Sequence, residues 1–228
     1  MQPYFLPYIG YWQLIAAVDR FVVLDDVHYI NRGWINRNRV VVNNTPAWLT
    51  LPLQKASQNK LIHEIEIQED DGWKNRMEKT LTCSYSKAPM FSSVSDFVAS
   101  LLQMARGNLS LYLSEVISKI SAKFGIQTYI IPTSRVFPKR ELKGQERILD
   151  ICKQLGATIY INPSGGRALY DKEKFQAHGI KLRFLEVPTS AGLCSGVGVG
   201  EQLSILDTLM HKSLHDICRS VADYKISE

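Results

Sequence analysis

The chain has 228 residues, of which 45% are hydrophobic and 21% are charged. This composition is ordinary for a soluble globular domain, and it excludes wholesale disorder because a disordered chain lacks so much apolar surface. No apolar run approaches the roughly 18 residues that a membrane helix needs, so we expect no membrane insertion. Lysine and arginine number 27 against 22 aspartates and glutamates, and this mild net charge of +5 disfavours a nucleic-acid partner.

The cysteines and histidines predict neither a disulfide framework nor a metal centre. All the cysteines lie far apart: Cys83, Cys152, Cys194 and Cys218. The N-terminus shows no basic region followed by an apolar segment, so we expect free thiols in a cytoplasmic protein. His211 and His215 are four residues apart on an expected helix. Because no acidic third ligand follows at a matching spacing, a solvated helix face is favoured over a metal site.

The pattern of apolar residues predicts strands that alternate with helices. In chain order we expect a helix at 11–18, strands at 20–24, 34–42, 48–53 and 62–67, helices at 72–82, 94–104 and 110–123, a strand at 127–131, a helix at 144–155, a strand at 158–161, a helix at 171–177, a strand at 181–185 and a helix at 202–210. Asn43 and Asn44 are a strong hairpin signal, because asparagine tolerates the positive φ of a tight turn.

This alternation is typical of a parallel sheet with crossover helices. We therefore predict an α/β fold with a parallel central sheet of the nucleotide-binding type. Residues 1–228 are expected to form a single domain, in which residues 34–67 form a β-rich insertion that contains the hairpin.

The N-terminal segment MQPYFLPYIGYWQLI carries the clearest functional signal in the chain. In a parallel sheet the ligand lies at the carboxyl ends of the strands, where a loop that enters a helix is a ready anion site. Gly10 would let the backbone approach a phosphate closely. We expect one cleft at the carboxyl edge of the sheet, lined by Gln2, Tyr8, Tyr11, Asp26, Arg37 and Ser164. The alternative is that the aromatic residues of this segment simply pack in the core and at its rim.

The spacing Pro7-Tyr8-Ile9-Gly10-Tyr11 resembles the P-x-H-x-G-H loop of the nucleotidylyltransferase superfamily, which includes pantothenate synthetase. The two histidines of that loop stabilise a triphosphate during adenylyl transfer. In this chain aromatic residues stand at both histidine positions, and Tyr11 is the second of them. A tyrosine hydroxyl donates a hydrogen bond but carries no positive charge. The resemblance therefore implies a related fold rather than ordinary adenylyl transfer.

A second resemblance covers nearly the whole chain. The opening MQPYFLPYIGYWQLIAAVDRFVVLDDVHYINRGWINRNR and the later stretches GATIYINPSGGRALYD and LSILDTLM resemble the WbqC-like family. Its members occur in gene clusters for O-antigen and other surface polysaccharides, which implies action on a nucleotide-linked or lipid-linked sugar. Members usually carry a short apolar strand before the Met-Gln-Pro, which would here be missing or supplied otherwise. Residues 189–200 are richer in glycine than the resemblance implies.

Two carboxylates, Asp25 and Asp26, end the apolar strand at 20–24, at the sheet edge where ligands bind. Paired carboxylates there could hold Mg²⁺, bind a ribose or amino group, or act as a general base. Together with Tyr11 they are the candidate catalytic residues. The alternative is a helix cap or a solvated turn.

Residues 31–39 combine arginine, asparagine and tryptophan. Arg37 can grip a phosphate or carboxylate with two parallel hydrogen bonds. Trp34 can stack on a base or sugar, and Asn36 would point to the opposite face of the strand. The alternative is a solvated strand face.

Two further loops follow later strands of the predicted sheet. The loop after 158–161 supplies five candidate binding residues: Asn162, Ser164, Gly165, Gly166 and Tyr170. Two glycines and a serine at a strand end make a cradle for a phosphate or oxyanion, and the alternative is a tight turn that needs positive φ. Ser134, after the strand at 127–131, belongs to a weaker loop of the same kind.

These features predict an enzyme of the transferase or amide-forming ligase type that modifies an amino sugar or sugar nucleotide for surface polysaccharide. A nucleotide or Mg²⁺ is the candidate cofactor, and a small molecule or sugar nucleotide is the expected partner. The alternative is a non-catalytic protein that binds a sugar nucleotide or a carrier through the same loops.

Overall fold

The computed structural model describes residues 1–139, 141–188 and 202–228. The helices are α1 (Ile9–Ala16), α2 (Gly72–Tyr85), α3 (Phe91–Gln103), α4 (Leu109–Lys123), α5 (Gly144–Gln154), α6 (Lys172–Ala177), α7 (Ile205–His211) and α8 (Leu214–Ala222), with 3₁₀ turns η1 (Ile62–Glu64), η2 (Ser134–Val136) and η3 (Ser164–Leu169). The strands are β1 (Arg20–Val22), β2 (Arg37–Val42), β3 (Thr45–Thr50), β4 (Leu53–Gln54), β5 (Glu66–Ile67), β6 (Tyr129–Ile131), β7 (Ile159–Pro163), β8 (Lys181–Glu186) and β9 (Lys225–Ser227). Cys194 and the glycine-rich residues 189–200 lie outside the described residues.

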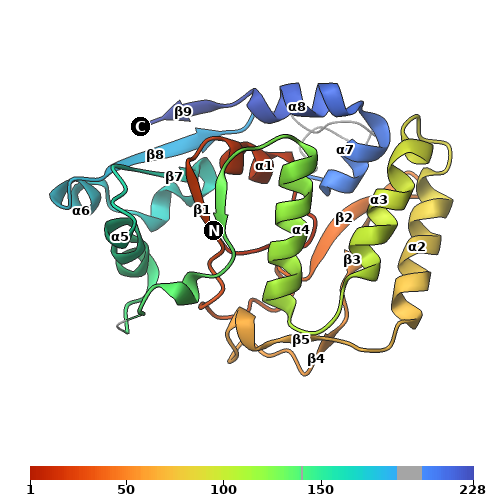
Figure 1. The fold of residues 1–228 in the computed structure, drawn as a ribbon, viewed down its shortest axis with the longest axis horizontal. Coiled ribbons are helices and arrows are strands. Elements are labelled where there is room, and N and C mark those ends of the chain that lie inside the picture. The colour runs from red at the N-terminus through yellow and green to blue at the C-terminus, as the bar shows by residue number, and fades with distance from the viewer. Residues whose placement is uncertain (140, 189–201) are drawn as a thin grey trace.

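The parallel strands form two separate pairs. β1 pairs with β6, and β7 pairs with β8, to which β9 adds in the antiparallel direction. Figure 1 shows α4 beside the first pair and α5 and α6 beside the second. The predicted mixture of α and β elements with parallel pairing is confirmed, but the described strands do not form one continuous parallel sheet. A cavity of about 530 Å³ lies between β1 and β7.

The predicted hairpin is confirmed, because β2 and β3 pair antiparallel along their whole lengths. Asn43 and Asn44 take φ values of 50° and 62°, the positive values that this two-residue turn requires. Residues 62–67 form η1 and the short β5 instead of one strand, since the Glu64 carboxylate accepts the Leu61 backbone N–H at 2.7 Å and stabilises a turn. That this β-rich region is an insertion in a single domain stays a prediction.

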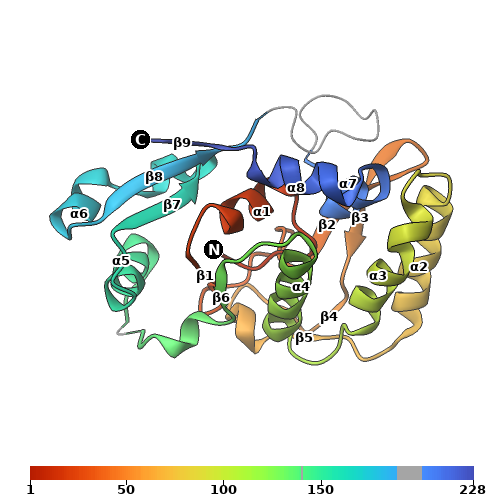
Figure 2. The same ribbon diagram turned by 45° about the horizontal axis from the view of Figure 1, so that its top comes forward.

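The helix α1 lies in the core, and seven of its eight residues are buried. The indole N–H of Trp12 donates to the carbonyl of Pro7 at 3.1 Å. The amide of Gln13 donates to the carbonyls of Ser220 and Asp223, each at 2.8 Å, and α8 accordingly lies beside α1 in Figures 1 and 2. The helix therefore holds the N-terminal segment in place.

The last helix, α8, was not predicted. Ser213 caps its start by accepting the backbone N–H of Asp216 at 3.2 Å. Because α7 ends at His211 and α8 begins at Leu214, His211 and His215 lie on different helices. The expectation that they share one helix face is wrong.

Three cysteines fall within the described ranges, namely Cys83, Cys152 and Cys218, and all three are free thiols as predicted. Of the helices that the structure describes, none is both long and apolar enough to cross a membrane.

Candidate functional site

Two consecutive carboxylates after β1 form the centre of a buried hydrogen-bond cluster. Asp25 accepts the hydroxyls of Ser110 and Thr133, both at 2.8 Å, and the backbone N–H of Ser134 at 3.0 Å. Its carbonyl oxygen accepts the backbone N–H of His63 at 3.2 Å. The residue is fully buried, so protein groups from α4 and from the loop after β6 take the places that solvent would occupy.

The second carboxylate, Asp26, forms an ion pair with Arg147 of α5. Arg147 Nη2 and Nε lie 2.9 and 3.2 Å from Oδ2, and the hydroxyl of Ser134 lies 2.6 Å from Oδ1. Arg147 is itself buried and also donates to the carbonyls of Ser134, Phe137 and Pro138. A buried pair is favourable only when such additional bonds satisfy both ions. The pair therefore ties α5 to the loops that follow β1 and β6.

The hydrogen bonds of this cluster favour a role in holding the surrounding loops in place over a role in acid–base chemistry. Asp25, Asp26 and Ser134 come together, but in an arrangement closed by the protein's own groups. Arg135, which is about half exposed, lies 3.6 Å from Asp25 on the outer side. Within the described ranges, no group of three or more histidine, cysteine, aspartate or glutamate side chains is arranged to hold a metal ion.

The side chain of Tyr11 points into the core. Its ring packs against Tyr4, Trp12 and Phe21, with ring centroids 5.5–6.0 Å apart. The hydroxyl donates to the carbonyl of Gln2 at 3.0 Å. Burial holds the pKa of Tyr11 well above its ordinary value of 10, so the hydroxyl stays protonated and keeps this bond. Tyr11 thus shapes the loop that precedes α1.

The start of α1 lies against the end of β8. Tyr8 is partly buried and precedes the helix without giving it a side-chain cap. A Cβ atom at Gly10 would lie 2.5 Å from the ring of Tyr8 and 2.7 Å from Val187, which directly follows β8. Only glycine fits there. The first backbone N–H groups of α1, which have no partner within the helix, therefore lie near the carboxyl end of β8.

The turn after β7 is held by Asn162, which is buried beneath it. A Cβ atom at Gly166 would collide with the Asn162 amide. The hydroxyl of Tyr160 lies 3.2 Å from Asn162 Oδ1 and 3.0 Å from the hydroxyl of Tyr170. Burial raises the pKa of both tyrosines, so these hydroxyls remain protonated. The contacts fix η3 against its own strand.

Gly165, at the outer side of η3, is exposed. Neither Gly165 nor Gly166 has a positive φ, so the alternative of a turn that needs one is wrong. A Cβ atom at Gly165 would meet no atom of the described residues within 4 Å. A glycine with ordinary backbone geometry and open space above it lets a ligand approach the backbone N–H groups at the start of the turn.

Sequence reasoning missed Glu186, the last residue of β8. Its carboxylate accepts Arg167 Nη2 and the hydroxyl of Ser227, each at 2.8 Å. The bond from Arg167 is the largest cause that holds the pKa of Glu186 below its ordinary value of 4.5. The side chain remains 43% exposed, so it offers a charged acceptor to solvent. The available signal was an acidic residue at the carboxyl end of a predicted strand.

Trp34 and Arg37 lie on the outer face of the hairpin with Trp48. The two indole centroids are 5.1 Å apart, and the Arg37 guanidinium lies 4.0 Å from the Trp48 ring centre. Arg37 Nε donates to the carbonyl of Gly33 at 3.0 Å, and Nη2 donates to that of Arg32. Two partly exposed indoles beside a guanidinium can stack on a ring of a ligand, but the guanidinium already holds the loop before β2.

Asn36 lies inside the base of the hairpin. Its Oδ1 accepts the hydroxyl of Tyr29 at 2.7 Å, and its Nδ2 donates to the carbonyl of Leu51 at 2.8 Å. These bonds connect the loop before β2 to the residue after β3. Most candidate residues fall into three groups: the buried carboxylate cluster, the outer hairpin face, and the loops around the start of α1 and η3, in which Gly10 is buried and Gly165 is exposed.

The fold and these three groups describe a mixed α/β protein in which Gly165, after β7, is exposed and Glu186, at the end of β8, is partly exposed. The chain belongs to the WbqC-like protein family, which matches residues 2–218. It is 31% identical over 188 residues to the uncharacterized protein Rv1507c of Mycobacterium tuberculosis, a match that covers 82% of this chain and 80% of that protein. No solved structure matches the chain.

Proposed function

We propose that this protein binds a sugar nucleotide and acts, as a transferase or amide-forming ligase, on an amino sugar destined for surface polysaccharide. The observation that carries the proposal is Gly165, which is exposed at the end of a parallel strand and has open space where a side chain would lie. Membership in the WbqC-like family supports the polysaccharide setting.

In this proposal the ligand lies across the start of α1 and the ends of β7 and β8. Its phosphate oxygens accept backbone N–H groups near Gly10 and Gly165, as anions do at helix starts. A ribose or sugar hydroxyl donates to Glu186, because a carboxylate is a strong acceptor for such hydroxyls. The charge of Glu186 is balanced by Arg167 at 2.8 Å, which lessens its repulsion of the phosphates. Tyr8 would border the ligand.

The buried carboxylates would then act through the loops they hold. Asp25 and Asp26 give their oxygens to Ser134, Arg147 and other protein groups. These bonds favour a role of both carboxylates in positioning the loops over the role of a general base. The same observation favours the second candidate function, a non-catalytic protein that recognises a sugar nucleotide or a carrier.

Binding is tested by titration calorimetry with UDP, UDP-glucose and UDP-N-acetylglucosamine. Gly165→Val should weaken binding by about tenfold or more, because its side chain would enter the ligand space. Its melting temperature should match that of the parent protein, since no atom of the part of the chain that the structure describes lies within 4 Å of the added Cβ. Gly72→Ala is the matched control, because its Cβ would meet only the movable end of Arg76 and the side chain of Asp70, both at 3.3 Å. Equal affinity of Gly165→Val and parent would contradict the proposed site.

Catalysis is tested separately from binding. The protein is incubated with pooled sugar nucleotides, amino acids and acyl donors, and products are followed by mass spectrometry. Turnover supports the enzyme. Binding of a sugar nucleotide without turnover of any pooled donor supports the non-catalytic function.

A further inference from the structure

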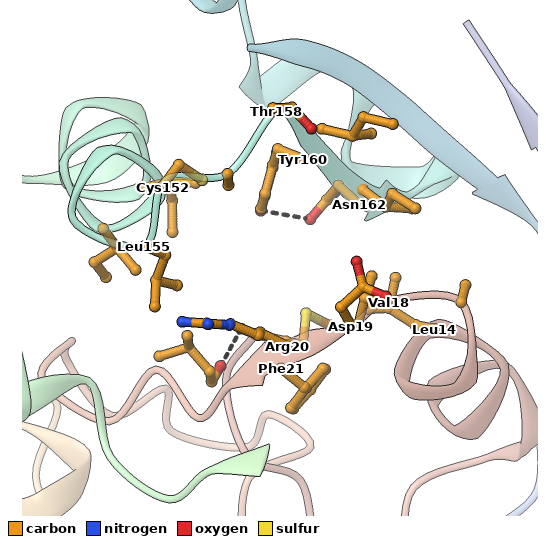
Figure 3. Close-up of a pocket in the computed structure, with 18 of the residues that line it drawn as sticks. Leu14, Val18, Asp19, Arg20, Phe21, Cys152, Leu155, Thr158, Tyr160 and Asn162 are labelled. Carbon is orange, nitrogen blue, oxygen red and sulfur yellow. Dashed lines mark hydrogen bonds between the residues drawn. The ribbon is translucent and has the colours of Figure 1, made fainter. Parts of the chain in front are cut away.

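The indoles on the outer face of the hairpin differ in their surroundings from the aromatic rings beside the cavity. Figure 3 shows Tyr160 at the cavity, where its hydroxyl lies 3.2 Å from Asn162 Oδ1. Trp34 and Trp48, by contrast, are 36% and 46% exposed, and their ring centroids are 5.1 Å apart. Neighbouring large apolar side chains that stay exposed mark a surface that meets a partner.

The pairing of β2 with β3 separates a buried face of the hairpin from this outer face. Residues opposite each other in an antiparallel pair lie on the same face. Asn38 pairs with Leu49, and both are buried. Arg39 pairs with Trp48 on the outer face, where Arg37 also lies because it is two residues earlier in the same strand. The outer face therefore carries guanidinium groups next to indoles.

The hairpin lies within a stretch of the sequence that has no acidic residue. Between Asp26 and Glu64 the chain has neither aspartate nor glutamate, but it has five basic residues: Arg32, Arg37, Arg39, Lys55 and Lys60. The whole chain has 27 lysines and arginines and 22 aspartates and glutamates, so the remainder has 22 of each and is neutral. The net charge of +5 thus belongs to this one stretch, which favours an anionic partner.

Arg37 forms no ion pair with a carboxylate of the described residues. Its Nε donates to the carbonyl of Gly33 at 3.0 Å, and its Nη2 donates to that of Arg32. These backbone oxygens orient the guanidinium without cancelling its charge. The Arg32 side chain itself is exposed. The loop before β2 therefore presents positive charge next to Trp34.

Acidic residues that follow the stretch have other partners. Glu64 accepts the backbone N–H of Leu61 at 2.7 Å, and Asp71 forms an ion pair with Lys74 at 2.8 Å. These carboxylates serve contacts outside the outer hairpin face.

The indoles are not arranged as an open platform for stacking. The guanidinium carbon of Arg37 lies 4.0 Å from the ring centre of Trp48, and that of Arg39 lies 5.5 Å from the ring centre of Trp34. The two indoles also pack against each other at an angle of 52°. Single-stranded nucleic acid stacks its bases on free ring faces. The headgroup region of a membrane has no such requirement and accepts the amphipathic ring of tryptophan.

Ile30 adds an exposed aliphatic residue beside this loop. Its carbonyl accepts the backbone N–H of Gly33 at 3.1 Å, which closes a turn directly before Trp34, and the residue is 51% exposed. The phosphates of a nucleic acid offer nothing to such a side chain. Apolar residues next to basic ones are instead typical of surfaces that lie in the membrane interface.

We propose that the outer hairpin face docks on the surface of a bilayer that contains anionic phospholipid. The indoles of Trp34 and Trp48 lie at the depth of the headgroups, where tryptophan is enriched in membrane proteins, and the neighbouring arginines lie near the lipid phosphates. The contact is peripheral, because the hairpin rests among the headgroups and does not cross the hydrocarbon. The proposal is independent of the proposed function, since it involves neither Gly165 nor Glu186.

The test measures co-sedimentation of the full chain with phosphatidylcholine vesicles that contain or lack phosphatidylglycerol. Phosphatidylglycerol should strengthen binding by about tenfold or more at low salt, and added salt should remove most of that gain because it screens the charges. Equal binding to both kinds of vesicle would overturn the proposal. Tighter binding to single-stranded polyuridine than to the anionic vesicles would also overturn it, because the face would then serve a nucleic acid.

Two exposed residues are then changed, each with a matched control outside the stretch. Arg32→Gln should weaken binding to the anionic vesicles by about fivefold, the contribution of one basic residue near such a surface. Ile30→Ser should weaken it by about fivefold as well, because less apolar surface is buried. Arg106→Gln and Leu111→Ser, at residues that are also exposed, should bind as the parent chain does. Test variants that bind as tightly as their controls would overturn the proposal.

Tryptophan fluorescence locates the contact. Of the four tryptophans, Trp12 and Trp73 are buried, so a shift of the emission to shorter wavelengths on adding anionic vesicles reports on Trp34 and Trp48. We expect this shift because both indoles move from water into the headgroup region. Binding without a shift would overturn the proposal, since the chain would then meet the vesicle through another surface.

Discussion

The two pairs of parallel strands end in different surroundings. After β1 and β6, the polar groups of Asp25, Asp26 and Ser134 are buried and are satisfied by one another and by Arg147. By contrast, Gly165, after β7, is exposed, and Glu186, at the end of β8, is partly exposed. Polar residues stand at the carboxyl ends of both pairs, but among the described residues the second set is exposed whereas the first is buried.

This difference separates stability from recognition. A buried charge must be satisfied inside the protein, and its removal from water is costly unless several groups bond it. Groups that meet this condition have little left to offer a substrate. Exposed groups that hold a fixed geometry, as η3 does against Asn162 and Tyr170, are available for binding. We therefore expect changes in the first region to alter stability and changes in the second to alter affinity.

The largest effect is expected at Arg147. Arg147→Met leaves the Asp26 carboxylate buried without its cation, and we expect the free energy of unfolding to fall by about 3–5 kcal/mol. Urea denaturation measures this. Arg135→Met is the control, because Arg135 is about half exposed, and should cost less than about 1 kcal/mol. A loss of less than about 1 kcal/mol for Arg147→Met would contradict the view that the first region serves stability and the second serves binding.

The free energy of unfolding should depend on pH through the amino group of Met1. Where the amino group of Met1 is free, its pKa is about 5 in the folded state and 8.0 in the unfolded state. The unfolded state therefore binds more protons between these values, and stability falls as the pH is lowered. From pH 8 to pH 6 the loss attributable to this group is roughly 2 kcal/mol. Denaturation of the Nα-acetylated chain supplies the comparison, and an unchanged pH dependence after acetylation would contradict the prediction.

Most of the fold could be predicted because its signals are local. The periodicity of α4 and α5 and the Asn43-Asn44 turn depend only on neighbouring residues, and their predicted bounds differ from the observed ones by one or two residues. The separation of the parallel strands into two pairs could not be predicted. Strand pairing depends on residues far apart in the chain, and no single strand's pattern records which partner lies on each side.

That the candidate residues lie at strand ends could be predicted from the sequence, whereas their surroundings could not. Asp25 and Asp26 could be placed at a strand end, but the partner that buries Asp26 is Arg147, which lies 121 positions away. Periodicity cannot reveal such a pair. Gly165 could be proposed as a binding residue because glycine and serine at a strand end are a recognisable pattern. Glu186 was not singled out although it directly follows a predicted strand, because a single exposed glutamate is ordinary on any protein surface.

A smaller effect is expected at Glu186, in the open region. Glu186→Gln keeps the shape of the side chain but removes its charge, so a ligand hydroxyl loses a charged acceptor. We expect affinity for UDP-glucose to fall by about tenfold while affinity for UDP alone changes less. Glu228→Gln is the matched control, since Glu228 is exposed and bonds Lys172 at 3.3 Å and Arg183 at 3.0 Å. Titration calorimetry measures the UDP-glucose affinity of both variants. Equal affinities of Glu186→Gln and Glu228→Gln would contradict the assignment of Glu186 to the ligand.

The smallest effect is expected at Arg37, which tests whether the hairpin face belongs to the open region. Its guanidinium donates to the carbonyls of Gly33 and Arg32 and lies on Trp48, so its present partners are protein groups. Arg37→Lys keeps the charge but loses the planar fork. We expect the free energy of unfolding to fall by about 0.5–1 kcal/mol and the sugar-nucleotide affinity to stay within about twofold.

The control for this change is Arg32→Lys, because that side chain is exposed and only its backbone carbonyl meets Arg37. It should alter neither stability nor affinity. A tenfold loss of affinity in Arg37→Lys alone would instead assign a ligand phosphate to Arg37, since a guanidinium makes two parallel bonds to a phosphate where an ammonium acts as a point charge. The outer face of the hairpin would then join the loops around Gly10 and Gly165 as part of one binding surface.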